Sequence, residues 1–178
     1  MKNRLNKSDW IGHGLRTLAK EGPNALKVGP LSTKLKVSRG SFYWHFRDIA
    51  DFRSQLLQSW QENSTNQVIQ DLDAREAEPD RLKHLMRLAF RGTRSLDRAI
   101  RSWATVDKNV AKIVASVDSR RVASIAKLLT EAGVEGERAR DRAAFVYWAY
   151  LGQTIVMDTR HSSMSVAALD DIGALFET

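Results

Sequence analysis

The sequence predicts an all-α protein of about nine helices. Nearly every segment of the 178 residues repeats its apolar positions at intervals of three and four, the periodicity of a helix. No run of β-branched residues bounded by hairpin turn signals interrupts this pattern. With 43% hydrophobic residues, the chain has enough apolar side chains to build a packed core. We therefore expect helices packed on helices, without a sheet.

The first three expected helices are short and closely spaced. The first begins near Asn6 or Ser8, either of which can cap it, and the Gly-Pro pair that follows ends it. The second covers residues 28–35 and has its proline in the first turn, where the missing amide is not needed. The third covers residues 39–46 and follows a turn that ends in Ser38, a good N-cap residue.

The later helices are longer. Their expected ranges are 48–72, 80–92, 95–105, 108–132, 136–157 and, at the end of the chain, 166–176. The helix over 108–132 repeats apolar residues at spacings typical of a partner-facing seam, with one arginine inside it: Val110, Val114, Val117, Arg121, Ile125 and Leu128. The helix over 136–157 is apolar around most of its circumference, which a small monomer cannot easily bury. Both features favour contact with a partner.

The positive charge is concentrated in the first third of the chain. Residues 1–60 hold eleven lysines and arginines against four acidic residues, which accounts for the whole net charge of +7. The other 118 residues hold 17 charges of each sign. A basic head on a neutral body indicates a polyanion-binding segment, although a merely solvated basic surface would have the same composition.

Residues 28–46 have the spacing of a helix-turn-helix. Phe42 and Phe46 are four residues apart and are expected to point inward, which fixes the third helix on the first two. A helix fits the major groove of DNA, which is ~12 Å wide and presents a distinct pattern for each base pair. In this position Arg39 can donate a bidentate pair to guanine. The other candidate contacts with bases or phosphates are Lys34, Lys36, Ser41, Tyr43 and His45.

A further set of residues makes this hypothesis more specific. Its members are Val28, Leu31, Leu35, Val37, Ser38, Gly40, Phe42, Tyr43, His45 and Phe46. In identity and spacing they resemble the helix-turn-helix of the tetracycline-repressor (TetR) family, whose recognition segment reads Val-Ser-x-Gly-x-Leu/Phe-Tyr-x-His-Phe. The resemblance covers about the first 60 residues, and the later helices are similar to that family only in number and length.

The resemblance implies roles for individual residues. Arg39, Gly40, Ser41 and Tyr43 would face the groove, Trp44 and His45 would brace the sugar-phosphate backbone, and Ser38 would start the helix beside them. Three departures from the family pattern stand out. Lys36 occupies a turn position that is usually glycine, Ser32 replaces a packed alanine, and Ile49 and Ala50 replace a lysine and a glutamate.

The resemblance also implies an arrangement for the whole chain. A DNA-binding domain would cover residues 1–47, and an effector-binding and dimerisation domain residues 48–178. The last two long helices would form a homodimer, and a small-molecule effector would release a repressor from a near-palindromic operator. The candidate effector contacts are Trp60, Met86, Phe90, Trp103, Tyr147, Trp148 and Tyr150, although aromatic residues at helical spacing are more often core.

Other classes of protein find little support. The chain has no cysteine, its four histidines are scattered, and no phosphate loop, nucleophile elbow or metal-binding spacing is present, so we predict no enzyme, metal or cofactor. The longest apolar run, residues 143–151, is far shorter than the ~20 residues of a membrane span. We expect a cytoplasmic protein without a membrane partner. Two alternatives stay open: a helical ligand-binding or scaffolding protein whose basic head contacts a protein or membrane, and a small helical enzyme with an unrecognised site.

Overall fold

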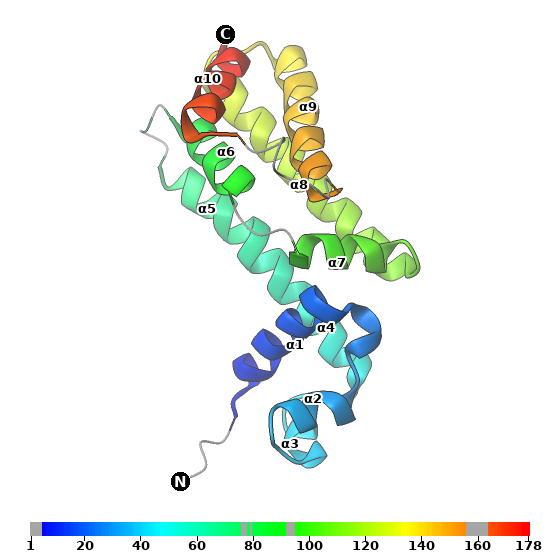
Figure 1. Ribbon diagram of the computed structural model, residues 1–178. Helices are drawn as coiled ribbons and strands as arrows, with labels where there is room; N and C mark the ends of the chain where they lie inside the picture. The colour runs from blue at the N-terminus through cyan, green and yellow to red at the C-terminus, as the bar shows by residue number, and fades with distance from the viewer. Residues whose placement is uncertain (1–4, 76–77, 79, 92–94, 156–163) are drawn as a thin grey trace. The chain divides into compact units, whose positions relative to one another are not determined.

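All regular structure in the described residues is helical, which confirms the predicted all-α fold. The computed structural model describes residues 5–75, 78, 80–91, 95–155 and 164–178 (Figure 1). Its α-helices are α1 (Lys7–Glu21), α2 (Val28–Lys34), α3 (Arg39–Tyr43), α4 (Ile49–Gln61), α5 (Gln67–Asp73), α6 (Arg81–Arg91), α7 (Ser95–Ala104), α8 (Lys108–Glu131), α9 (Gly136–Ile155) and α10 (Val166–Glu177). A 3-10 turn, η1 (Pro23–Ala25), and a π-helix, η2 (Glu62–Asn66), complete the set.

The helices form two compact units. The first contains Met1–Ser64 and Ser95–Val114, and the second contains Thr65–Arg94 and Ala115–Thr178. The expected domain boundary after residue 47 stays a prediction, because these units describe contacts and not separate domains. The predicted helix ends at Gly92 and Met157 lie outside the described residues. Among the described helices, none is both long enough and apolar enough to cross a membrane.

The first helix begins and ends where the sequence predicts. The Asn6 side chain accepts the Asp9 amide at 2.9 Å, and the Asp9 carboxylate accepts the Asn6 amide at 2.8 Å. This reciprocal pair is a capping box, which satisfies two amides that have no partner inside the helix. At the other end Gly22 adopts a φ of 78°, which a glycine reaches without strain.

An aromatic cluster forms the core of the first unit. Phe42 of α3 packs edge-on against Trp10 of α1 and Phe52 of α4, with 5.4 Å between ring centroids in both pairs. Phe46 lies 4.8 Å from the Phe52 ring, and both Phe42 and Phe46 are buried, as predicted. Gly14 allows α1 to approach this cluster, since a Cβ there would come within 2.6 Å of the Phe52 ring. The short helix α3 is therefore held by tertiary contacts.

The helix predicted over residues 48–72 is present but changes its hydrogen-bond register part-way along. It is divided into α4 and α5 by the π-helix η2. Within this segment the Ser64 hydroxyl donates to the Trp60 backbone carbonyl at 2.6 Å, and the side-chain amide of Asn63 donates to the Ser59 backbone carbonyl at 2.9 Å. Short polar side chains that compete for backbone carbonyls in this way loosen the α-helical register. Residues 49–73 are helical throughout, as predicted, but the sequence analysis did not predict the π-helical segment.

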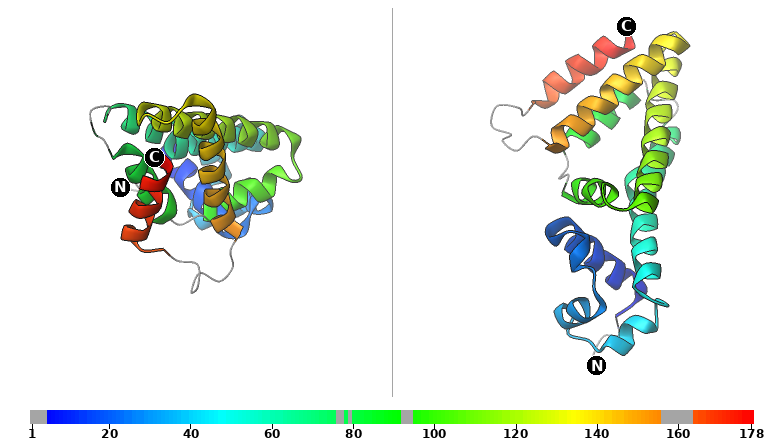
Figure 2. Two further views of the ribbon diagram at one scale, coloured as in Figure 1. Left: turned by 90° about the horizontal axis from the view of Figure 1, so that it is seen from above. Right: turned by 90° about the vertical axis from the view of Figure 1, so that its right-hand side faces the viewer.

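The second unit has its own core, built from α6, α8, α9 and α10. Its buried residues are Leu82, Met86, Ile125, Leu129, Val134, Ala139, Ala143, Val146, Tyr147 and Leu169. Figure 2 shows these four helices gathered together. Helix α10 lies against α6, where Gly173 is so close to Lys83 and Met86 that a Cβ would meet them at 3.2 and 3.3 Å. A bidentate ion pair between Arg87 and Asp170 joins the same two helices.

The seam predicted on the helix over 108–132 does not face a partner. Its five apolar residues, Val110, Val114, Val117, Ile125 and Leu128, are at most 7% exposed within the chain. The periodicity therefore identifies a buried face of α8, but the face is covered by this chain itself. The inference of a partner from this seam was wrong.

Helix α9 has two apolar faces. One face is buried in the core of the second unit, through residues that include Ala143 and Tyr147. The other is open, because Phe145, Trp148 and Ile155 are 59%, 67% and 70% exposed. The apolar circumference predicted for this helix is therefore only partly covered by the chain itself.

Candidate nucleic-acid interface

Helix α3 lies at the surface of the first unit with its aromatic core on one side. Opposite this core, Tyr43 is 58% exposed and Trp44 is 76% exposed. Arg39 and Gly40 are also exposed, whereas Ser41 is partly buried. The structure thus brings the predicted groove-facing residues to one short helix. Ser38 precedes this helix in extended conformation with a φ of −73°, and its side chain makes no capping hydrogen bond.

The turn between α2 and α3 contains the backbone strain that the sequence suggested. Lys36 has a φ of 56°, in the left-handed region that favours glycine. The Val37 amide donates to the Ser32 carbonyl at 3.0 Å, and the Lys36 amide donates to the Thr33 carbonyl at 3.1 Å. These two bonds form a Schellman motif, which closes a helix and needs a left-handed residue where Lys36 stands.

Lys34 is placed near the same surface but has a partner in the free protein. Its ammonium group donates to the Glu21 carboxylate in an ion pair whose side chains are 42% and 41% exposed. The hydrogen bond from Lys34 lowers the pKa of Glu21 below its usual value. A phosphate that binds Lys34 must therefore share it with Glu21 or replace that carboxylate.

His45 ties α3 to the start of the chain. Its Nε2 atom lies 3.1 Å from the carbonyl oxygen of Leu5, so this nitrogen must be the donor. The ammonium group of Lys7 lies 5.8 Å from the centroid of the ring of Phe46, the residue next to His45. Because Nε2 is engaged, only Nδ1 of His45 is left for the predicted contact with the DNA backbone.

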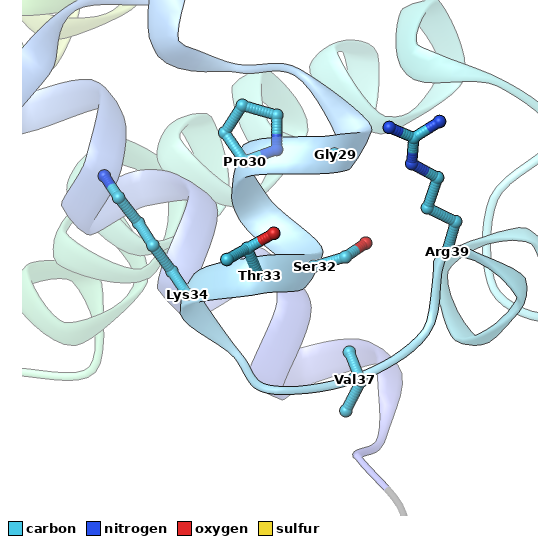
Figure 3. Close-up of a pocket in the computed structure, with 7 residues that line it drawn as sticks. All are labelled: Gly29, Pro30, Ser32, Thr33, Lys34, Val37 and Arg39. Atoms are coloured by element: carbon cyan, nitrogen blue, oxygen red, sulfur yellow. The ribbon is translucent and has the colours of Figure 1, made fainter.

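A shallow pocket separates α2 from α3 (Figure 3). Its volume is about 580 Å³, and its lining residues are Gly29, Pro30, Ser32, Thr33, Lys34, Val37 and Arg39. The Arg39 guanidinium lies over Gly29, so close that a Cβ on Gly29 would be 3.1 Å from one of its nitrogens. The Ser32 hydroxyl is buried and has no hydrogen-bond partner. Sequence reasoning singled out Lys34 and Arg39 but treated Ser32 only as a departure from the TetR pattern.

The candidate effector residues belong to both units. In the first unit, Trp60 and Trp103 are buried; Trp60 donates through its Nε1 to Asp97 at 3.1 Å, and the Arg53 guanidinium lies 6.0 Å from the Trp103 ring centroid. In the second unit, Met86 and Tyr147 are buried in the core, Phe90 and Tyr150 pack against it, and Trp148 is exposed.

A polar cluster inside the second unit accompanies these aromatic residues. Tyr147 and Tyr150 are stacked with 5.7 Å between ring centroids, and the Tyr147 hydroxyl donates to Asp118 at 2.6 Å. The Arg121 guanidinium lies 5.6 Å from the Tyr150 ring centroid and donates to the Thr65 hydroxyl at 2.9 Å. The sequence marked Arg121 by its place among apolar residues but contained no signal for Asp118. Within the described part of the chain, no group of three or more potential ligands is placed to hold a metal ion.

Comparison with known proteins finds similarity in structure but not in sequence. No protein-family model matches the chain, and neither does any curated protein. A solved structure of a candidate transcriptional regulator from Saccharomonospora viridis, in complex with choline, superposes with a TM-score of 0.71 over 96% of this chain and 94% of that one. The two sequences are 16% identical, so the likeness concerns the fold.

Proposed function

We propose that this chain is a sequence-specific, DNA-binding transcriptional regulator of the TetR type. The observation that carries the proposal is the exposed face of α3, where Tyr43 and Trp44 are 58% and 76% exposed. Tyrosine and tryptophan are enriched among the residues that contribute most to binding at recognition surfaces. The buried rings of Phe42 and Phe46 hold this face in place, and the shared regulator fold supports the same assignment.

The charge of the chain supports DNA as the partner. Phosphate contacts supply most of the affinity of DNA-binding proteins, and lysine and arginine make them. The excess of positive charge lies in residues 1–60, which include the turn residue Lys36 and the start of α3 at Arg39. Both side chains belong to residues that are exposed on the first unit.

A homodimer is the second part of the proposal. The open face of α9 presents Phe145, Trp148 and Ile155, spaced at intervals of three and seven along the helix. The neighbouring helix α8 exposes the small residues Ser119 and Ala123, which allow another helix to approach closely. A second copy offers the same two features, so α8 and α9 of two subunits can pack as a four-helix bundle about a two-fold axis. The partner-facing surface would then lie mainly on α9.

The dimer determines what kind of operator would be bound. Two recognition helices related by a two-fold axis fit half-sites ~34 to 36 Å apart, or a multiple of this, on a near-palindromic duplex. We propose that a small-molecule effector releases the regulator from this operator, as a repressor. Such a ligand must prefer one arrangement of the two recognition helices, since equal affinity for both would change nothing.

The cluster of Tyr147, Tyr150, Asp118 and Arg121 in the second unit suggests what charge the effector has. The structural neighbour was solved with choline, a cation that aromatic rings commonly bind. In this chain the Arg121 guanidinium already lies over the Tyr150 ring. A quaternary ammonium ligand at this ring would have to displace it. We therefore propose that the effector is uncharged or anionic. Choline is then the negative control: it should not release the protein from DNA.

The experiment that tests the proposed function is fluorescence anisotropy on duplexes tiled across the region upstream of the gene, with shuffled duplexes as controls. We expect tight binding to one tile of two-fold symmetry, at least ~10³-fold tighter than to shuffled DNA. Tyr43→Ala is expected to weaken binding to that tile. Lys112→Ala removes an exposed charge on α8, outside the helix-turn-helix, and is the matched control.

A second candidate function predicts a different result. If the basic head serves a protein or membrane surface, binding to all duplexes is equal, weak and strongly dependent on salt. Equal affinity for every tile and every shuffled duplex would count against the regulator, provided that the tiles cover the operator.

A further inference from the structure

The pocket between α2 and α3 contains a buried hydroxyl with no partner in this chain. Ser32 is 3% exposed, it lines the pocket, and its Oγ atom makes no hydrogen bond. A buried donor that lacks a partner lowers stability, so such a group calls for an explanation. Ser32 stands where the TetR pattern has an alanine, which would pack there without this cost. Figure 3 shows the hydroxyl directed across the pocket toward Arg39.

Arg39 forms the facing wall of the pocket. Its guanidinium lies over Gly29, within 3.1 Å of the position that a Cβ would take there. Arg39 makes no hydrogen bond or ion pair with the described part of the chain. Of the described residues that line the pocket, none is acidic. Two groups able to donate hydrogen bonds, Ser32 and Arg39, therefore face one hollow that contains no counter-charge.

We propose that this pocket binds a phosphate group of the DNA backbone, with the Arg39 guanidinium and the Ser32 hydroxyl as its ligands. Arg39 then contacts the backbone and does not read a base, which differs from the expectation drawn from the sequence. A phosphate offers several acceptor oxygens, and a guanidinium can bind two of them at once while a hydroxyl binds a third. The inference rests on the proposed DNA-binding function and specifies one contact within it.

The chemistry of the site is that of a phosphate, which can come from DNA or from solution. Lys34 also lines the pocket and adds positive charge, although Glu21 shares it in the free protein. The hollow of about 580 Å³ is open to solvent and large enough for a phosphate group that carries its sugars on either side. We assign it to the duplex because it lies between the two helices of the helix-turn-helix, beside the exposed face of α3.

The first test measures the salt dependence of DNA binding for Arg39→Ala and Ser32→Ala. Affinity for a mixed-sequence duplex is measured between 50 and 200 mM salt, with Lys112→Ala as the control. Loss of one phosphate contact makes the slope of log affinity against log salt about 0.9 less steep. Between 50 and 200 mM salt, the drop in affinity should therefore be about 3.5-fold smaller for Arg39→Ala than for the wild type. Ser32→Ala should weaken binding without changing the slope, and the double variant should be no weaker than Arg39→Ala.

The same variants separate a backbone contact from a base contact. Under the proposal, Arg39→Ala weakens the operator tile and shuffled duplexes by the same factor. A loss confined to the tile, with an unchanged salt slope, would mean that Arg39 reads a base and would overturn the proposal. If the wild type binds no tile preferentially, the proposed regulator fails, yet the mixed-sequence duplex still tests the pocket, because a phosphate contact does not depend on sequence.

The second test identifies the source of the phosphate. Inorganic phosphate is added at constant ionic strength while the amide resonances of Gly29, Ser32 and Thr33 are followed by NMR. The proposal predicts that phosphate shifts these resonances in the wild type but not in Arg39→Ala. It also predicts that Arg39→Ala reduces the salt dependence of DNA binding. Shifts without any effect of Arg39→Ala on DNA binding would show a site for a free anion and overturn it. Absence of both effects would overturn it as well.

Discussion

Lys36 provides the sharpest test of the helix-turn-helix geometry. It closes α2 with a φ of 56°, in a Schellman motif made by its own amide and that of Val37. Helix α8 ends in the same motif, with Gly133 at the equivalent position and a φ of 96°. The chain therefore contains one such turn with the residue that the backbone favours and one with a lysine. We expect Lys36→Gly to stabilise the protein.

The magnitude follows from two opposing effects. A side-chain-bearing residue in the left-handed region costs roughly 1 to 2 kcal/mol relative to glycine. Glycine gains more freedom on unfolding, which returns about 0.5 to 1 kcal/mol. The net gain for Lys36→Gly is about 0.5 to 1 kcal/mol, equivalent to a Tm increase of about 2 °C in a chain of this size. Lys36→Ala removes the same charge but keeps the strain, so its free energy of unfolding should change by less than ~0.5 kcal/mol.

The assay is urea unfolding followed by circular dichroism, at one fixed protein concentration because a dimer shifts the midpoint. Gly133→Ala supplies the converse control, since a Cβ there meets no atom within 4 Å and only the φ of 96° opposes it. Both Lys36 variants should lose the same DNA affinity, because both lose the same charge. If Gly133→Ala destabilises the protein while Lys36→Gly is no more stable than Lys36→Ala, Lys36 is not in a left-handed turn.

Three further predictions concern packing, assembly and pH. Gly14→Ala should lower the free energy of unfolding by ~1 to 3 kcal/mol, because its Cβ would overlap the aromatic core. Gly12→Ala in the same helix should leave the free energy of unfolding unchanged or raise it by up to ~1 kcal/mol. Urea unfolding of both variants tests this difference. Trp148→Glu should weaken a homodimer by about 30-fold or more in sedimentation equilibrium, and Trp44→Glu, at an exposed tryptophan directly after α3, should leave the assembly unchanged. The pKa of Asp170 is lowered by the hydrogen bond from its arginine partner, so its contribution to stability is present above the usual value of 3.8 and is lost as the pH falls through the lowered pKa. The difference in urea midpoint between the wild type and Asp170→Asn should therefore shrink between pH 7 and pH 3, and a constant difference would contradict this.

Helix boundaries could be predicted where a single residue decides them. Asn6 begins α1 through a capping box, Gly22 ends it, and Gly133 ends α8, all at the positions inferred from the sequence. These signals are local, because each depends on the hydrogen bonds or the backbone angle of one residue. The π-helix η2 depends on which of several competing hydrogen bonds Asn63 and Ser64 make, and residue type alone does not decide that.

The candidate interface could be predicted in outline but not in its finer contacts. Phe42 and Phe46 identify the inward face of α3 by their spacing, so the exposure of Tyr43 and Trp44 follows. Where a long flexible side chain lies is a different matter. Arg39 can extend from α3 toward a base or fold back over α2, and its position depends on the space that Gly29 leaves open. That space arises from two helices packed together and has no signature in either one.

The two long helices α8 and α9 show the same distinction at a larger scale. Both have apolar residues at helical spacing, and the pattern on α8 is the more regular of the two. Yet the apolar side chains of that pattern are buried within the chain, while Trp148 on α9 remains 67% exposed. Apolar residues at helical spacing indicate that one face of the helix is buried, because burial of apolar surface drives both folding and association. Whether that face is buried against the same chain or against a second chain depends on which other apolar faces of the chain are available to pack on it. Because the apolar face of α8 is buried within its own chain, the open apolar face of α9 is the main surface on which a dimer could form. Replacement of Trp148 tests this.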